Sequence, residues 1–145
     1  MTRPTGERGS SLLLFPAAVL VMMVLGAIAV DFSIAFLGER ELAGATAAAA
    51  NDAAARAVSN RDFYREGVVV LDLATAREVA TEVVRASLDR ERYHDVRVTV
   101  TLAPAGRAVV VSASAEVDYL FARGLVGAPG RAHVAATSSA SLRSA

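Results

Sequence analysis

The sequence LLLFPAAVLVMMVLGAIAV, residues 12–30, decides the fold of this chain. It is an unbroken apolar run of 19 residues that contains no charged residue, Asn, Gln or His. As an α-helix it would rise about 1.5 Å per residue, which comes to roughly the ~30 Å thickness of the hydrocarbon core of a bilayer. A helix in a small soluble domain needs an apolar stripe, not an apolar surface all round. The run therefore predicts a membrane-spanning helix between a short segment, residues 1–11, and the rest of the chain.

Basic residues near the two ends of the run predict its orientation. Arg3 and Arg8 precede the run, whereas Arg40 follows it within an acidic flank. The positive-inside rule then places the N-terminus in the cytoplasm. Residues 31–145 are expected outside the cell membrane, which the chain would cross once.

A cleaved signal peptide is the alternative interpretation of the same run. Ala27-Ile28-Ala29 has the small-x-small pattern of a signal-peptidase site. Cleavage near Ala29 would give a secreted or membrane-anchored extracytoplasmic binding module. The run is longer than the ~7–15 residues of a usual signal-peptide core, however, and helix-forming sequence continues beyond it. We therefore favour an uncleaved anchor.

An Ala-rich segment, residues 31–59, follows the apolar run without a proline. Residues 43–57 contain ten alanines, and alanine is the best intrinsic helix former. We expect one helix of about 45–50 residues, half in lipid and half outside. Small residues recur at every fourth position, a spacing that lets another helix approach closely. One row at this spacing is Ala45, Ala49 and Ala53, and our candidates for helix packing or assembly are Gly26, Asp31, Gly44, Ala48 and Asp52.

Residues 60–145 predict a small domain. It begins with a polar, glycine-containing loop at residues 60–67. From Asp72 onward the apolar residues recur at helical spacing, which predicts an amphipathic helix. Its N-terminus is expected either at Asp72 as N-cap or at a capping box formed by Thr75 and Glu78.

Apolar and polar residues then alternate with a period of two over three stretches, residues 96–102, 108–119 and 132–143. This period predicts half-buried strands. The connections at residues 103–107 and 120–131 are rich in Gly and Pro, as turns are. The expected fold class is α+β: a transmembrane helix continuing into a stalk helix, then one helix packed on a three-stranded antiparallel sheet.

The composition and the spacing of the titratable residues argue against a catalytic site, a metal site or a nucleic-acid interface. The chain has no Cys, and its 15 basic and 15 acidic residues balance, which gives no reason to expect nucleic acid as a partner. His94 and His133 lack the spacing of metal ligands, and Glu116 and Asp118 alternate on a strand face that we expect to be solvated. We therefore expect no enzyme activity, no cofactor, no metal and no small-molecule substrate.

Four short motifs in and around the apolar run resemble one known family. They are RGS, AVDFS, EREL and NDAAA, at residues 8–10, 29–33, 39–42 and 51–55. This pattern resembles the TadE/TadG-like proteins of the bacterial Flp (tight adherence) pilus assembly system. The resemblance covers residues 8–59, and the later helix and alternating strands follow the family in pattern.

The resemblance implies a membrane-anchored, non-enzymatic component of a Tad/Flp-type pilus assembly or secretion system, either minor pilin-like or accessory. It implies that the N-terminal helix contacts the bilayer and other pilus-assembly proteins or sister subunits. In pilin-like members a processing Gly, here Gly9, is followed five residues later by a Glu. That position is Leu14 in this chain. The short, uncleaved TadG-like type therefore fits the sequence better.

Overall fold

The computed structural model describes residues 10–58 and 71–141 of the chain. The predicted loop at residues 60–67 and the candidate processing residue Gly9 lie outside the described residues.

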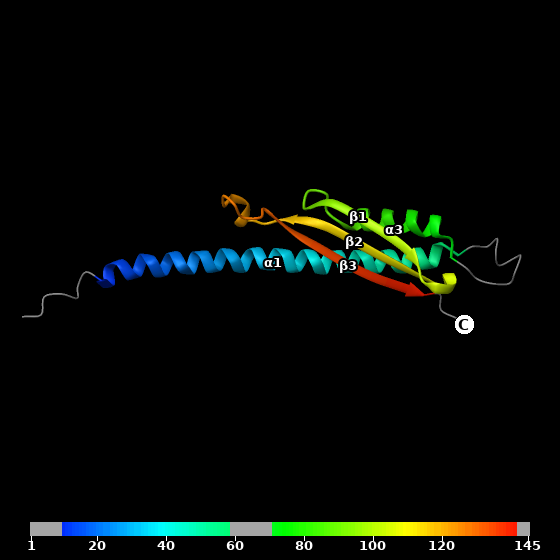
Figure 1. The fold of residues 1–145 in the computed structure, drawn as a ribbon, viewed down its shortest axis with the longest axis horizontal. Helices are drawn as coiled ribbons and strands as arrows, with labels where there is room; N and C mark the ends of the chain where they lie inside the picture. Colours follow the sequence, from blue (N-terminus) through cyan, green and yellow to red (C-terminus); the bar gives the residue numbers. More distant parts are fainter. Residues whose placement is uncertain (1–9, 59–70, 142–145) are drawn as a thin grey trace, which may run out of the picture.

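One long helix, α1 (Ser10–Arg56), forms the axis of the molecule. Its 47 residues form a single continuous helix, as the sequence predicts. Its N-terminal part projects from the rest of the structure, and its C-terminal part lies along the sheet (Figure 1). Among the described residues, it is the one helix that is long and apolar enough to cross a membrane. The chain is thus compatible with a single-pass membrane protein.

The second helix, α3 (Leu73–Ser87), begins at an N-cap residue, Asp72. The Asp72 carboxylate accepts hydrogen bonds from the backbone N–H of Thr75 at 3.0 Å and from the Thr75 hydroxyl at 2.6 Å. These bonds satisfy N–H groups that have no partner inside the helix. Of the two predicted starts, the structure therefore has the Asp72 cap. Thr75 supports it rather than opening a capping box with Glu78.

Three antiparallel strands in the order β1-β2-β3 form the sheet: β1 (Tyr93–Leu102), β2 (Ala108–Asp118) and β3 (Arg131–Ser141). Short 3₁₀ turns, η1 (Pro104–Gly106) and η2 (Ala122–Gly124), lie in the two connections. The predicted α+β fold with a three-stranded antiparallel sheet is confirmed.

β1 begins at Tyr93, three residues earlier than the alternation predicts. The strand pairing shifts between His94 and Arg97, and Asp95 has a positive φ of 50°. An extra residue in a strand, a β-bulge, interrupts the period of two. Tyr93 and Val96 both turn inward although they are three positions apart, so the sequence pattern hides the first part of the strand.

The core lies between the sheet and two helices that pack on the same face of it. α1 contacts β2 and β3, and α3 contacts β1 and α1. α1 contributes small side chains, so helix and sheet approach closely. The C-terminal half of α1 is therefore part of the domain core and not a separate stalk. The buried residues of this core include Leu42, Ala45, Ala49, Ala53, Ala76, Ala80, Val84, Val109, Val111 and Val117.

Candidate functional site

The connection between β2 and β3, residues 119–130, lies beside the projecting part of α1 (Figure 1). We call it the β2–β3 loop. It is joined to the helix at Asp31, whose carboxylate accepts hydrogen bonds from three consecutive backbone N–H groups of the loop. The donors are Leu120 at 2.8 Å, Phe121 at 3.0 Å and Ala122 at 2.8 Å. Asp31 is only 7% exposed, so the loop covers it.

Three donors make this buried carboxylate tolerable. A buried carboxylate is costly unless hydrogen bonds replace its water, and bonds to an ionised acceptor are stronger than neutral ones. Asp31 was a candidate for contacts with other helices. The structure instead places it in a contact within the chain, between α1 and the β2–β3 loop.

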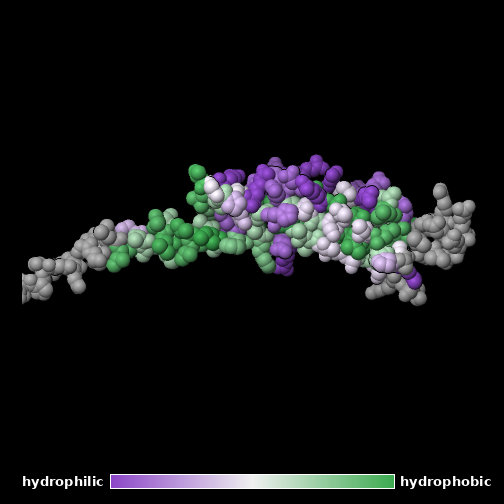
Figure 2. Space-filling model, viewed as in Figure 1, coloured by the Kyte–Doolittle hydropathy of each residue, from purple (hydrophilic) through white to green (hydrophobic). Residues whose placement is uncertain are grey.

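An apolar cleft of about 420 Å³ opens next to this contact, between α1 and the β2–β3 loop. Apolar surface covers both the projecting part of α1 and the tip of the loop (Figure 2). The cleft thus has an apolar lining, with the Asp31 carboxylate at one end bound to the loop. The side chains around it are Met23, Val24, Ala27, Ile28, Asp31, Phe121, Ala122 and Leu125.

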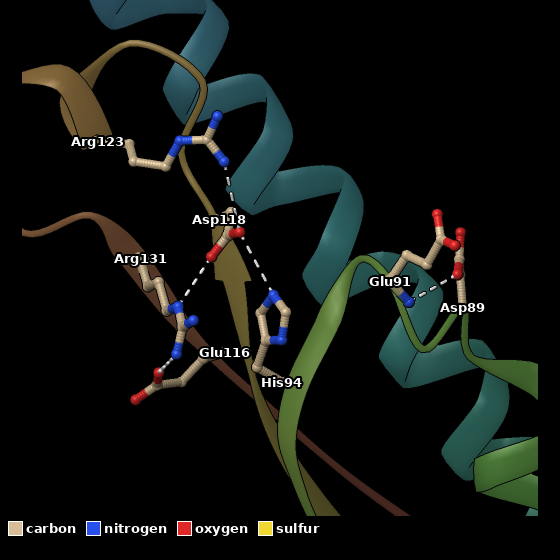
Figure 3. A network of polar contacts seen from close by, with 7 residues as sticks. All are labelled: Asp89, Glu91, His94, Glu116, Asp118, Arg123 and Arg131. Atoms are coloured by element: carbon tan, nitrogen blue, oxygen red, sulfur yellow. Dashed lines mark hydrogen bonds and ion pairs between the residues drawn. The ribbon is translucent and has the colours of Figure 1, made fainter.

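A cluster of charged side chains lies at the base of the β2–β3 loop (Figure 3). Asp118 is at its centre, 2.8 Å from Arg131 Nε, 3.3 Å from His94 Nε2 and 3.8 Å from Arg123. Arg131 also lies 3.3 Å from Glu116. The hydrogen bond from Arg131 lowers the pKa of Asp118 below its ordinary value. These contacts join β1, β2, β3 and the loop, so the cluster holds the base of the loop to the sheet.

A second contact holds α1 against β1 and β2. The hydroxyl of Tyr93 donates a hydrogen bond to Glu41 Oε2 at 2.8 Å and lies 3.3 Å from the carbonyl oxygen of Gly38. Burial and the neighbouring Glu41 carboxylate raise the pKa of Tyr93. Gly38 is buried, and a Cβ atom there would lie 3.0 Å from Val117 Cγ2. The absence of a side chain at Gly38 thus permits the close approach of α1 and β2.

The other candidate packing residues lie at exposed or partly exposed positions of α1. A Cβ atom at Gly26 or Gly44 would have no neighbour within 4 Å. Ala48 is exposed, and Asp52 lies 3.4 Å from Arg56 in an exposed pair one helical turn away. Gly26, Gly44 and Ala48 are thus at exposed positions of α1, and Asp52 is partly exposed. The row that packs in the core is Ala45, Ala49 and Ala53.

Sequence reasoning missed Gly38 and Tyr93 as contact residues. The signal at Gly38 was a small residue just before the charged EREL motif, but spacing alone does not single it out. His94 is half-buried at Asp118, and His133 is exposed on β3. Within residues 10–58 and 71–141, no three His, Asp or Glu side chains come together as metal ligands.

Comparisons of this chain with protein-family models, with curated proteins and with solved structures found no match.

Proposed function

We propose that this chain is a non-enzymatic, single-pass membrane component of a Tad/Flp-type pilus assembly or secretion system. Its α1 helix would cross the membrane with the N-terminus in the cytoplasm, and its α+β domain would lie outside. One observation carries the anchor: large apolar side chains cover the N-terminal half of α1 and are exposed. Phe15, Met22 and Met23 are 74%, 71% and 72% exposed.

Lipid is the environment that such a surface fits. Leaving apolar surface in water costs about 25 cal/mol per Å², and here it surrounds the helix instead of forming a stripe that the domain could cover. The C-terminal half of the same helix is in the domain core, so the domain would stay attached to the membrane by a continuous helix.

Two features favour this anchor over a signal peptide cleaved near Ala29. α1 runs through Ala29 without interruption. Cleavage there would also leave Phe32, Phe36 and Leu37 exposed to water in the secreted product, at 71%, 63% and 53%. Exposing such side chains to water costs free energy, whereas an anchored domain can hold them in or near lipid.

The pilus part of the proposal is supported by the motifs at residues 8–59 and by the outer side of α1. Gly44 and Ala48 form an exposed row of small residues one helical turn apart, which would let the helix of a sister subunit or assembly protein approach closely. In this role the chain works by packing, with no bound cofactor and no reaction.

Membrane insertion can be tested in the full chain. Because the chain has no Cys, the variants Thr5→Cys and Thr137→Cys provide single labelling sites before and after the proposed span. In intact cells an impermeant maleimide should label Thr137→Cys alone, and alkaline carbonate should not extract either variant. Deleting residues 9–30 should release the chain from the membrane fraction. Retention of this deletion variant, or recovery from the medium of a protein that starts at Val30, would contradict the anchor.

The pilus role needs a separate test in the cell of origin. Deleting the gene should reduce the number of pili counted by electron microscopy, and the full-length gene should restore them. A matched variant lacking residues 9–30 should not. An unchanged number of pili in the deletion strain would overturn the pilus assignment and leave the anchor untouched.

A further inference from the structure

The exposed surface of α1 remains apolar beyond the end of the sequence run at Val30. Phe32, Phe36 and Leu37 are all more than half exposed. The Ser33 hydroxyl donates a hydrogen bond to a backbone oxygen of the helix itself, Ala29 O, at 2.8 Å. Within α1, the single charged residue before Glu39 is Asp31, and the β2–β3 loop covers it.

The β2–β3 loop presents a second apolar surface at the same end of the molecule. Leu120, Phe121 and Leu125 are 58%, 48% and 64% exposed, and Val126 is fully exposed. These side chains belong to a loop that is bound to Asp31, and the loop presents apolar surface next to that of α1 (Figure 2). Exposed large apolar side chains gathered in one loop indicate a contact surface.

Charged residues on α1 and on the sheet lie at the same level along the length of the molecule. On α1 the exposed charged residues begin with Glu39, the residue after Gly38, and Gly38 packs against Val117 of β2. On the sheet, the neighbours of Val117 are Glu116 and Asp118, in the charged cluster. Asp31 precedes Gly38 by seven residues, or about 10 Å along the helix. The loop therefore extends about 10 Å beyond this level toward the apolar end.

Arg123 is the one charged residue of the β2–β3 loop, residues 119–130. Its guanidinium group reaches back to Asp118, at 3.8 Å, so its charge lies toward the base of the loop (Figure 3). Long basic side chains at membrane surfaces behave in this way, with the apolar stem in lipid and the charge at the headgroups.

We propose, building on the membrane anchor above, that the tip of the β2–β3 loop inserts into the outer leaflet beside α1. The lipid boundary then lies near Gly38, at the charged level, instead of at Val30. The segment from Leu14 to Leu37 has 24 residues and would be about 36 Å long, enough for the hydrocarbon core and part of the interface. The occupant of the apolar surface is lipid, because that surface is continuous with the one on α1.

This placement also accounts for the Asp31 contact. At a depth of about 10 Å the carboxylate would have little water, and ionisable groups among lipids need partners. The three loop N–H groups supply them, and Asp31 in turn satisfies backbone groups that lipid could not.

Tryptophan fluorescence tests the insertion, because the chain has no Trp of its own. The full-length variants Val126→Trp, Val21→Trp and Thr99→Trp each place one Trp at an exposed position, in the loop, in α1 and on the outer face of the sheet. Each variant is reconstituted into phosphatidylcholine vesicles with and without lipids brominated near the headgroup end of the acyl chains. We expect bromine to quench Val126→Trp and Val21→Trp, and not Thr99→Trp.

The outcomes separate the two proposals. Quenching of Val21→Trp without quenching of Val126→Trp overturns the loop insertion and leaves the anchor in place. No quenching of Val21→Trp contradicts the anchor itself. The Val126→Trp emission could instead be blue-shifted but not quenched by bromine, and the shift could revert when the protein is diluted in the vesicles. That result would assign the loop to a contact with a second copy of the chain and would overturn the lipid contact.

Discussion

The carboxylate of Asp31 in α1 accepts a hydrogen bond from the backbone N–H of Ala122 at 2.8 Å, across 91 residues of sequence. Two more N–H groups of the same loop donate to it, so one side chain fixes the position of the β2–β3 loop against the helix. The loop and the projecting helix therefore form one end of the molecule.

Replacing Asp31 should free the loop. Asp31→Ala removes the acceptor of three N–H groups, and Asp31→Asn keeps one oxygen, so we expect both variants to be less stable than the parent, Asp31→Ala more so. In detergent micelles, amide hydrogen exchange of Leu120, Phe121 and Ala122 should accelerate by about tenfold or more in Asp31→Ala. Asp52→Asn, in an exposed pair, is the control and should leave exchange at these amides unchanged. Equal exchange in Asp31→Ala and the parent would mean that the carboxylate does not hold the loop.

Gly38 and Gly44 make a matched pair on one helix. Replacing Gly by Ala in a helix interior raises the free energy of unfolding by roughly 1 kcal/mol. We expect this increase for Gly44→Ala, because open space surrounds that position. At Gly38 the new methyl group would lie 3.0 Å from Val117 Cγ2, and overpacking costs about 1–3 kcal/mol. We expect the melting temperature of Gly38→Ala in micelles to fall below that of Gly44→Ala.

Removing the Val117 side chain that Gly38→Ala would contact tests this explanation. In a Val117→Ala background the obstructing Cγ2 atom is gone, so Gly38→Ala should become stabilising, as Gly44→Ala is. If Gly38→Ala and Gly44→Ala stabilise the parent equally, α1 and β2 do not need a glycine at their contact.

The regular elements could be predicted because each has a local signal. The apolar run and the alanines predict α1. The Asp72 cap and the helical spacing of the apolar residues after it predict α3, and the period of two predicts most of the sheet. The bulge at Asp95 broke that period and hid Tyr93. A β-bulge depends on strand pairing, which a single sequence does not display.

The site was harder to predict because its contacts join distant segments. Asp31 ends an apolar run, as an ordinary interfacial residue would, and its partners are backbone groups that no side-chain pattern can reveal. The two rows of small residues on α1 have the same spacing. Only the position of α3 and the sheet decides that Ala45 and Ala49 are buried while Gly44 and Ala48 are exposed.

Tyr93→Phe should weaken the contact between β1 and α1. The Tyr93 hydroxyl donates to Glu41 Oε2 at 2.8 Å, and a typical hydrogen bond of this kind contributes about 1 kcal/mol. We expect a lower melting temperature in micelles for Tyr93→Phe and little change for Tyr119→Phe, which has no hydrogen bond from its hydroxyl among the described contacts. Because the pKa of Tyr93 is raised above the ordinary 10.0, its contribution should persist at neutral pH and fade as the pH rises above 10. A Tyr93→Phe variant as stable as the parent at pH 7 would contradict this role.

Acid should remove the stabilising charge at the start of α3. Hydrogen bonds from the Thr75 hydroxyl and backbone N–H lower the pKa of Asp72 below 3.8. The ionised cap therefore stabilises the fold at a pH above about 4, and this contribution is lost as the pH falls through the lowered pKa. Asp72→Asn keeps an N-cap acceptor that does not titrate, so it serves as the matched variant. We expect the parent to melt at a higher temperature than Asp72→Asn at pH 7, and the difference to shrink as the pH is lowered toward 2. A difference that is constant between pH 7 and pH 2 would show that the charge of Asp72 does not contribute to the cap.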